Sequence, residues 1–355
     1  MLAGDEPAPP AIQGTIVRSA LELWDGARVS ARAWLVPAPD TTAHAEFLAF
    51  LPEACVGVVD RLEPLRLGLS GAAVFMVTTA RGKYVLRVQD GKIDDRYFAQ
   101  QLNVLRRAAE AGIAPAVVHV DEAARAVVLQ LVAGPPLHSA LADPAQRAQV
   151  LASAVDALRT LHAFEPSGVP EGDPLPYAWE LWQKFRERPG VPPWAEAVPA
   201  RLDAIAATLS GDGRRVVSHN DVNPGNLLWD GARVWLIDWE AAGLGHPYYD
   251  LATLALFLRL EEDVALQLVA RHDGAPPNDR SVASFRVLRQ LAGVLCGLTF
   301  LSLVDDLKVR HAPTRKEAPT LGECFAELRT GQLDLQSPRG QASIGLALLA
   351  LGLGP

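Results

Sequence analysis

The chain has 355 residues, of which 49% are hydrophobic and 21% charged, as expected for a globular protein with two domains or two large lobes. Its formal net charge is −8 and its cations form no stripe along the sequence, which disfavours nucleic acid as a partner. No apolar run approaches the length of about 18 residues that a membrane span needs, and the acidic, proline-rich start does not resemble a secretion signal. We therefore expect a cytoplasmic protein with no membrane partner. Cys55, Cys296 and Cys324 are too widely spaced for a metal site and are expected to be buried free thiols.

The first sixty residues are predicted to form an extension whose role the sequence does not reveal. Residues 1–10 are rich in proline, and residues 12–24 have the apolar spacing of a helix. A short strand is expected at 34–39, followed by a helix from Thr41 or Thr42 to Leu51. The hexamer at 24–29 recurs at 229–234, and both copies are predicted to be hairpin turns.

The next part of the chain has the pattern of an antiparallel β lobe. Strands are expected at 58–67, 73–79, 84–89, 117–120 and 127–132, with glycine-containing turns between the first three. Asp94 or Asp95 is expected to cap an intervening helix, which Gly112 ends. We expect this small lobe to span residues 61–133.

The rest of the chain is predicted to be mainly helical. Gly134 and the two prolines after it break the strand pattern and form a hinge. Helices are expected from Pro144 to about Ala163, at 200–209, at 250–260, and in several segments after 281, whereas the proline-rich segment 166–199 is expected to cross the surface. The sequence thus predicts an α+β, bilobal fold whose larger lobe covers 134–355, with a ligand site in the cleft between the lobes.

The most specific motif runs from His219 to Asn226 and is followed twelve residues later by Asp238. Phosphoryl transfer needs a carboxylate at the attacking hydroxyl and oxygen ligands for Mg²⁺ on the phosphates. Asp221 would accept the hydroxyl proton, and Asn226 and Asp238 would coordinate the metal ion through oxygen. Each residue alone could simply cap a turn, but their joint spacing favours the catalytic interpretation. His219 is expected to hold the loop by hydrogen bonding.

These residues, together with the segments 237–240 and 249–252, resemble the aminoglycoside phosphotransferase and choline/thiamine kinase superfamily. The resemblance covers residues 65–260 and is specific in its second half. It implies a protein-kinase-like fold, ATP and Mg²⁺ as cofactors, and a small-molecule hydroxyl as the acceptor. It also implies that Asp250 anchors the catalytic loop from the start of a helix.

The nucleotide side of the pattern is weaker. Gly68, Ser70 and Gly71 lie in a turn between two predicted strands, where backbone amides can approach phosphates. A turn of this composition also joins many hairpins without any chemical role. The same segment lacks the strand-to-helix context of a serine nucleophile, which disfavours a hydrolase.

A departure from the family pattern leaves one alternative open. Arg87 stands where the family has a lysine, and Gln101 stands where the family has the partner glutamate. A guanidinium can still bind phosphates bidentately, and Gln101 could accept one hydrogen bond from it. The alternative is a kinase-like protein that binds a nucleotide without transferring its phosphate.

The acceptor is not specified by the sequence. No Trp or Tyr follows Tyr249, so the C-terminal helices offer little for an aromatic cage around choline. Aromatic residues of the segment 177–182 are candidates for the cleft, with core packing as the alternative. Glu240 and the acidic run 261–263 could attract an amine-bearing sugar, with a solvated surface as the alternative. The oligomeric state is equally unspecified.

Overall fold

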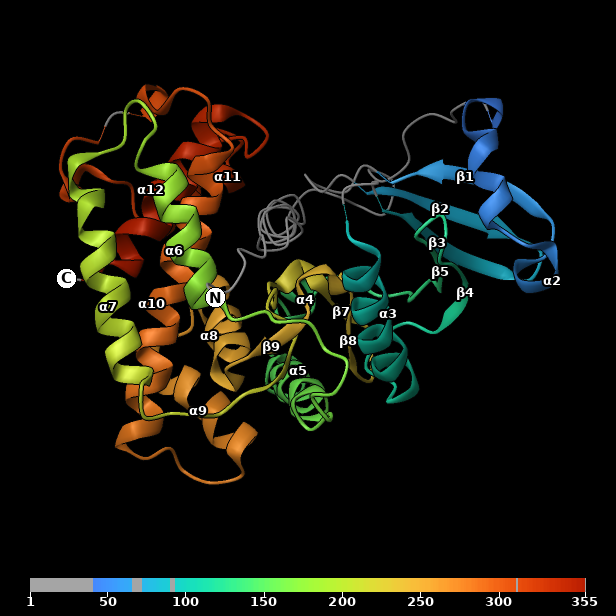
Figure 1. The fold of residues 1–355 in the computed structure, drawn as a ribbon, viewed down its shortest axis with the longest axis horizontal. Helices are drawn as coiled ribbons and strands as arrows, with labels where there is room; N and C mark the ends of the chain where they lie inside the picture. Colours follow the sequence, from blue (N-terminus) through green and yellow to red (C-terminus); the bar gives the residue numbers. More distant parts are fainter. Residues whose placement is uncertain (1–40, 66–71, 90–92, 311, 355) are drawn as a thin grey trace, which may run out of the picture.

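The structure is a computed structural model that describes residues 41–65, 72–89, 93–310 and 312–354, with side chains from residue 46 onward. The predicted elements at 12–24 and 34–39, the first copy of the repeated hexamer, and Gly68, Ser70 and Gly71 lie outside the described residues. A lobe built around an antiparallel sheet stands beside a larger helical lobe (Figure 1). The predicted α+β, bilobal arrangement is confirmed.

The small lobe is a five-stranded antiparallel sheet in the order β1-β2-β3-β5-β4. Its strands are β1 (Val59–Pro64), β2 (Ala73–Thr79), β3 (Gly82–Val88), β4 (Val117–Asp121) and β5 (Ala126–Gln130). Val77 and Leu86 are fully buried on one face of the sheet. Leu51, which follows η1 (Thr41–Phe50), and Val56 of α2 (Glu53–Val56) share that core, so residues preceding β1 help to stabilise the lobe.

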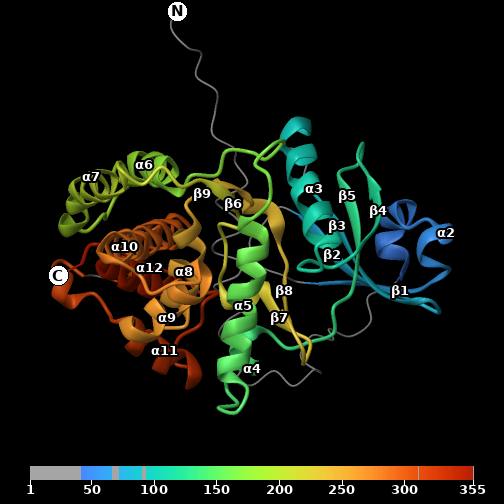
Figure 2. The same ribbon diagram turned by 90° about the horizontal axis from the view of Figure 1, so that it is seen from below.

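Helix α3 (Asp95–Glu110) lies between the sheet and the helical lobe (Figures 1 and 2). Asp94 caps it, since its carboxylate accepts the backbone N–H groups of Arg96 and Tyr97. Phe98, Leu102 and other residues of one face are buried. This helix is confirmed with the predicted cap, and Gly112 follows it with a φ of 71°.

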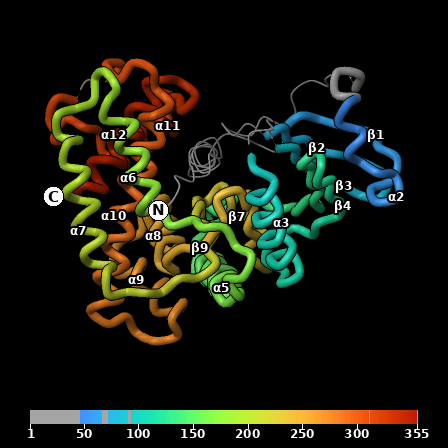
Figure 3. Tube along the Cα trace, viewed as in Figure 1, coloured from blue at the N-terminus to red at the C-terminus, as the bar shows by residue number. Residues whose placement is uncertain are grey.

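The helical lobe contains both long core helices and short connecting turns. These are α4 (Leu137–Ala140), α5 (Arg147–His162), α6 (Pro174–Phe185), η2 (Pro193–Ala197), α7 (Val198–Leu209), α8 (Pro247–Phe257), α9 (Glu262–Asp273), α10 (Asp279–Ser302), η5 (Leu307–Arg310), η6 (Arg315–Glu317), α11 (Leu321–Arg329) and α12 (Pro338–Gly352). The C-terminal end of the chain lies in this lobe, away from the sheet (Figure 3). Helix α5 begins at Arg147 and not at Pro144, because Asp143 accepts the N–H of Ala145 and closes a turn first.

Helix α10 is the centre of the helical lobe and packs against α6, α7, α8 and α12. The approach to α12 requires glycine: a Cβ at Gly297 would stand 2.6 Å from the backbone nitrogen of Leu349. By length and composition α10 could cross a membrane, but 78% of its apolar window is buried inside the protein, as in an ordinary core helix.

The predicted surface course of residues 166–199 is wrong. Pro174 occupies the first turn of α6, where proline is tolerated, and Asp173 caps the helix by accepting the N–H of Leu175. Tyr177, Trp182 and other apolar residues of one face are buried in the main core. The prolines were interpreted as helix breakers, although Pro174 stands at a helix start, where proline is tolerated.

The cysteines differ from the prediction at one position. Cys296 and Cys324 are buried free thiols, whereas Cys55 is exposed on α2. Burial raises the pKa of Cys324 to about 12, so that thiol stays protonated.

Candidate active site

Two short antiparallel pairs hold the predicted catalytic motif. β6 (Val216–Ser218) pairs with β9 (Gly243–Gly245), and β7 (Leu227–Trp229) pairs with β8 (Val234–Leu236). The second pair is a hairpin at the second copy of the repeated hexamer, as predicted. The backbone N–H of Ile237 donates to the carbonyl of Asn226 at 2.9 Å, which extends this pairing by one step. Asn226 and Asp238 therefore lie at the same end of the hairpin.

Asp221 is fully buried in the loop between β6 and η3 (Pro224–Asn226). The side-chain amide of Asn226 donates to its Oδ2 at 2.7 Å, and that of Asn223 donates to its Oδ1 at 2.9 Å. Two amide donors fix the plane of the carboxylate. The sequence interpretation of the motif did not include Asn223, which also caps η3 through the N–H of Gly225.

The backbone is in the left-handed region of φ and ψ at two residues of the site, Asn220 and Asp238. Asn220 has a φ of 60° and Asp238 a φ of 64°, a conformation that residues other than glycine seldom adopt. The side chain of Asn220 offsets this strain, because its amide donates to the carbonyls of Gly172 and Ala241, each at 3.1 Å. These bonds attach the loop to the segment that follows Asp238 and to the segment before α6.

Asp250 lies fully buried in the first turn of α8, directly beneath the motif. Its Oδ2 accepts the backbone N–H of His219 at 2.9 Å, and its Oδ1 accepts that of Asn220 at 2.8 Å. One carboxylate thus satisfies two buried backbone donors that no strand reaches. This geometry is what a loop anchor requires.

His219 is buried and packs its ring 4.9 Å from that of Trp239 of η4 (Trp239–Ala241). Its Nε2 lies 3.0 Å from the carbonyl oxygen of Ile237. Burial lowers its pKa, so the ring is neutral, and the carbonyl partner requires the proton to be on Nε2. His219 therefore ties the loop to the segment that carries Asp238.

Arg87 reaches across from β3 to the motif of the helical lobe. Its guanidinium lies 2.8 Å from Oδ1 of Asp238 and also forms an ion pair with Glu240. Burial opposes the charge, but the two carboxylates outweigh that effect and hold the pKa of Arg87 above its usual value. The guanidinium is therefore a permanent cation within the site.

The partner expected for Arg87 in helix α3 is replaced. Gln101 does not accept a hydrogen bond from Arg87; it donates its side-chain amide to the backbone carbonyl of Glu240. Tyr97 donates to the same carbonyl at 3.3 Å, and burial raises its pKa to about 12. Two side chains of helix α3 thus hold the backbone of Glu240 in place. The carboxylate of Glu240 pairs with Arg87 in place of the glutamate that the family has at the position of Gln101. The signal in the sequence was the acid two residues after Asp238.

For the aromatic residues of α6 and the acidic run at 261–263, the structure supports the alternatives to an acceptor site. Glu240 is only 6% exposed and paired with Arg87, so it does not present a charge to an amine. Tyr177 and Trp182 are buried in the helical core. Residues 261–263 are exposed at the start of α9, and Glu262 pairs with Arg286, which is the solvated-surface alternative.

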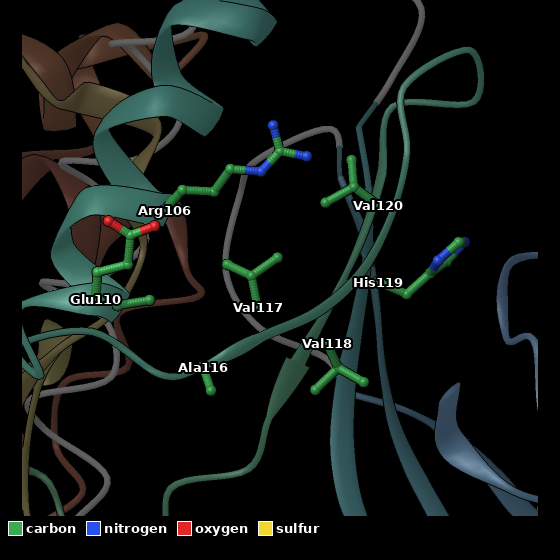
Figure 4. A pocket seen from close by; sticks show the side chains of 8 residues that line it. Arg106, Glu110, Ala116, Val117, Val118, His119 and Val120 are labelled. Carbon is green, nitrogen blue, oxygen red and sulfur yellow. The ribbon is translucent and has the colours of Figure 1, made fainter. Parts of the chain in front are cut away.

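A groove of about 570 Å³ lies on the small lobe, between α3 and β4. Figure 4 shows Arg106 and Glu110 of α3 facing Val117 and Val120 of β4 across it. None of the described residues of the predicted site lines this groove. Its shape comes from the junction of helix and sheet.

Asn226 and Asp238 fit the ligand set of a nucleotide-bound Mg²⁺. The amide nitrogen of Asn226 is engaged by Asp221, which turns its oxygen away from that residue. Among the described residues, no group of three or more His, Cys, Asp or Glu side chains could hold a metal ion. An amide and a carboxylate oxygen beside phosphates are a set that Mg²⁺ accepts, since it keeps several non-protein ligands.

The model of the phosphotransferase enzyme family, APH, matches residues 61–285, and the chain belongs to this family. The protein LicA of Haemophilus influenzae is 40% identical over 47 residues, which are 13% of this chain and 18% of LicA. The chain thus matches less than a fifth of that relative's length.

Two solved structures extend the likeness to the whole fold. A choline/ethanolamine kinase family protein from Mesorhizobium loti aligns with a TM-score of 0.58 at 23% identity, over 88% of this chain and 99% of that protein. An aminoglycoside-3'-phosphotransferase of type VIII aligns with a TM-score of 0.50 at 23% identity, over 71% of this chain and 98% of that protein. The predicted protein-kinase-like fold and family resemblance are confirmed.

Proposed function

We propose that this protein transfers the γ-phosphate of ATP to a hydroxyl group of a small molecule. The observation that carries the proposal is the joint geometry of Asp221, Asn226 and Asp238 in a member of the phosphotransferase family. Asp221 and Asn226 share a hydrogen bond, and the β7–β8 register brings Asp238 to the end of the hairpin where Asn226 lies. These are the base and the two oxygen ligands that phosphoryl transfer needs.

In the proposed reaction Asp221 orients the acceptor hydroxyl and takes its proton. The hydroxyl oxygen forms a bond to the γ-phosphorus while the bond from that phosphorus to the ADP oxygen breaks. Asn226 and Asp238 would hold Mg²⁺, which neutralises charge on the phosphates. Arg87 contributes a fixed positive charge beside Asp238, and Asp250 and His219 keep the loop in position.

We propose the nucleotide site between the small lobe and the motif. Gly68, Ser70 and Gly71 remain the proposed phosphate-covering turn, and Arg87 of β3 is the cation proposed to act on the phosphates with them. The proposed division keeps the small lobe at 61–133 and the helical lobe at 134–355, with residues 47–56 packed on the sheet. Cytoplasmic location and the lack of nucleic acid or membrane partners remain predictions.

An amine-bearing alcohol is the acceptor class to test first, because the relatives are named for choline, ethanolamine and aminoglycosides. ADP release should be measured with choline, ethanolamine, thiamine, hydroxy amino acids and aminoglycosides. At least one acceptor should raise ADP release well above the rate with ATP alone. ATP binding without stimulation by any acceptor would support the binding-only alternative, against which stands the presence of Asp221, Asn226 and Asp238.

Replacing Arg87 by Lys should raise the KM for ATP by about tenfold, because an ammonium cannot bridge Asp238 and Glu240 with two parallel contacts. The effect on kcat should be smaller, since Asp221 is untouched. The matched control is Arg61→Lys, whose side chain is 57% exposed on β1. Steady-state kinetics against ATP concentration measure the change, and an unaltered KM would contradict the role given to Arg87.

A further inference from the structure

Two histidines, His162 of α5 and His272 of α9, join the catalytic loop to the protein surface. Nδ1 of His162 lies 2.8 Å from Nε2 of His272, and its Nε2 lies 2.9 Å from Oδ2 of Asp250. At the other end, Nδ1 of His272 lies 2.8 Å from Oδ1 of Asp273. Side-chain exposure rises along this line from 0% at Asp250 to 4% at His162, 11% at His272 and 26% at Asp273.

The protons in this line can be counted. Both carboxylates act as acceptors: Asp250 also receives two backbone N–H groups, and Asp273 also receives the hydroxyl of Tyr248. Each of the three contacts therefore needs one proton on an imidazole nitrogen. Two neutral imidazoles carry only two protons between them, so three satisfied contacts require one imidazolium and one neutral ring.

We propose that His162 and His272 share three protons and act as positioning residues, so that the catalytic loop is held most firmly while the third proton is present. Without it, one contact brings two lone pairs together at hydrogen-bond distance. The rings then separate, and Asp250 loses a fixed partner next to the backbone of His219 and Asn220. The pair is thus a pH-sensitive support of the loop.

The charged surroundings decide which ring carries the extra proton. Burial lowers the pKa of His272 and outweighs Asp273, which raises it; the neighbouring His162 and Arg159 lower it further. His272 is then the neutral ring: its proton is on Nδ1 toward Asp273, and its Nε2 accepts from Nδ1 of His162. The titratable and charged groups that face the pair from neighbouring elements are Asp250 and Tyr248 of α8, Arg159 of α5, Asp273 of α9 and, through Asp250, His219.

The sign of the pH effect follows directly. The third proton is held at low pH and lost as the pH rises through the histidine range, roughly pH 5 to 8. Support of the loop is therefore present on the acid side and declines toward the alkaline side.

Two substitutions remove the need for the third proton. In His272→Gln the new amide donates to Nδ1 of a neutral His162, which keeps its own N–H for Asp250. In Asp273→Asn the new amide donates to His272, whose other nitrogen then donates to His162. Both variants can satisfy the line with uncharged rings, and both sites lie outside the proposed catalytic machinery.

Hydrogen–deuterium exchange resolved to the backbone amides of His219 and Asn220 tests the proposal. After correction for intrinsic exchange, protection in the wild type should fall by roughly three- to tenfold between about pH 5.5 and 8, a fraction of one charge-assisted hydrogen bond. Protection in His272→Gln and Asp273→Asn should change by less than about twofold. The control amide is that of Leu236, which donates to Ile113 at 2.8 Å and should not respond.

A flat profile in the wild type, or variants that follow the wild-type profile, would overturn the proposal. If His272→Gln does not fold, the exposed Asp273→Asn decides the question alone. The measurement needs neither ATP nor an acceptor, so its outcome is independent of the proposed function.

Discussion

Replacing Asp221 by Asn is expected to lower kcat by about 10²- to 10⁴-fold, the usual contribution of a positioned general base. The carboxylate is buried and held by the amides of Asn223 and Asn226. An amide in its place cannot accept the hydroxyl proton. The affinity for ATP should change little, because the proposed contacts to the phosphates come from other residues. Kinetics and calorimetric titration with ATP measure the two effects separately.

The control for this variant is Asp203→Asn, which removes the same charge at an exposed position on α7. It should leave kcat unaltered. The melting temperature of Asp221→Asn must also be recorded, since the new amide faces two amide donors. Retained transfer by a folded Asp221→Asn protein would rule out its role as the base.

Replacing Asp250 by Asn is expected to lower the free energy of unfolding by about 3 kcal/mol, since a buried acceptor of charged strength is lost. The carboxylate accepts the N–H groups of His219 and Asn220 and contacts His162. The amide group would face at least one of these donors with its own N–H. Denaturant unfolding measures the stability change.

The same variant should also lose about 10²-fold in kcat, because a loop displaced by about 1 Å misplaces the base. Asp203→Asn again serves as the control for lost charge. Wild-type stability in Asp250→Asn would show that the loop does not depend on this carboxylate.

The sequence predicted the elements that depend on local patterns. The cap at Asp94, the strands of the small lobe and the hairpin after Asn226 are set by neighbouring residues, and the structure confirms them. The dense motif from His219 to Asn226 identified the loop because its polar residues stand between two short strands.

Long-range pairing limited the rest of the prediction. The carboxylate partner of Arg87 comes from Glu240, more than 150 residues later, and no local rule links them. The contact between His162 and His272 spans 110 residues. The helix α6 was missed for a different reason: prolines were interpreted as breakers although Pro174 stands at a helix start.

The acceptor site is the part that the fold constrains least. Buried aromatic residues of α6 belong to the core, and Glu240 serves Arg87, so neither of these groups selects an amine. A panel of acceptors therefore tests the acceptor class directly.

Transfer of the γ-phosphate to a hydroxyl can be followed by ³¹P NMR of the products formed from ATP, Mg²⁺ and a stimulating acceptor. We expect ADP together with a phosphomonoester whose phosphorus couples to protons on the acceptor carbon, and loss of that ester with Asp221→Asn. Inorganic phosphate alone, or AMP with pyrophosphate, would contradict the transfer of the γ-phosphate to a hydroxyl.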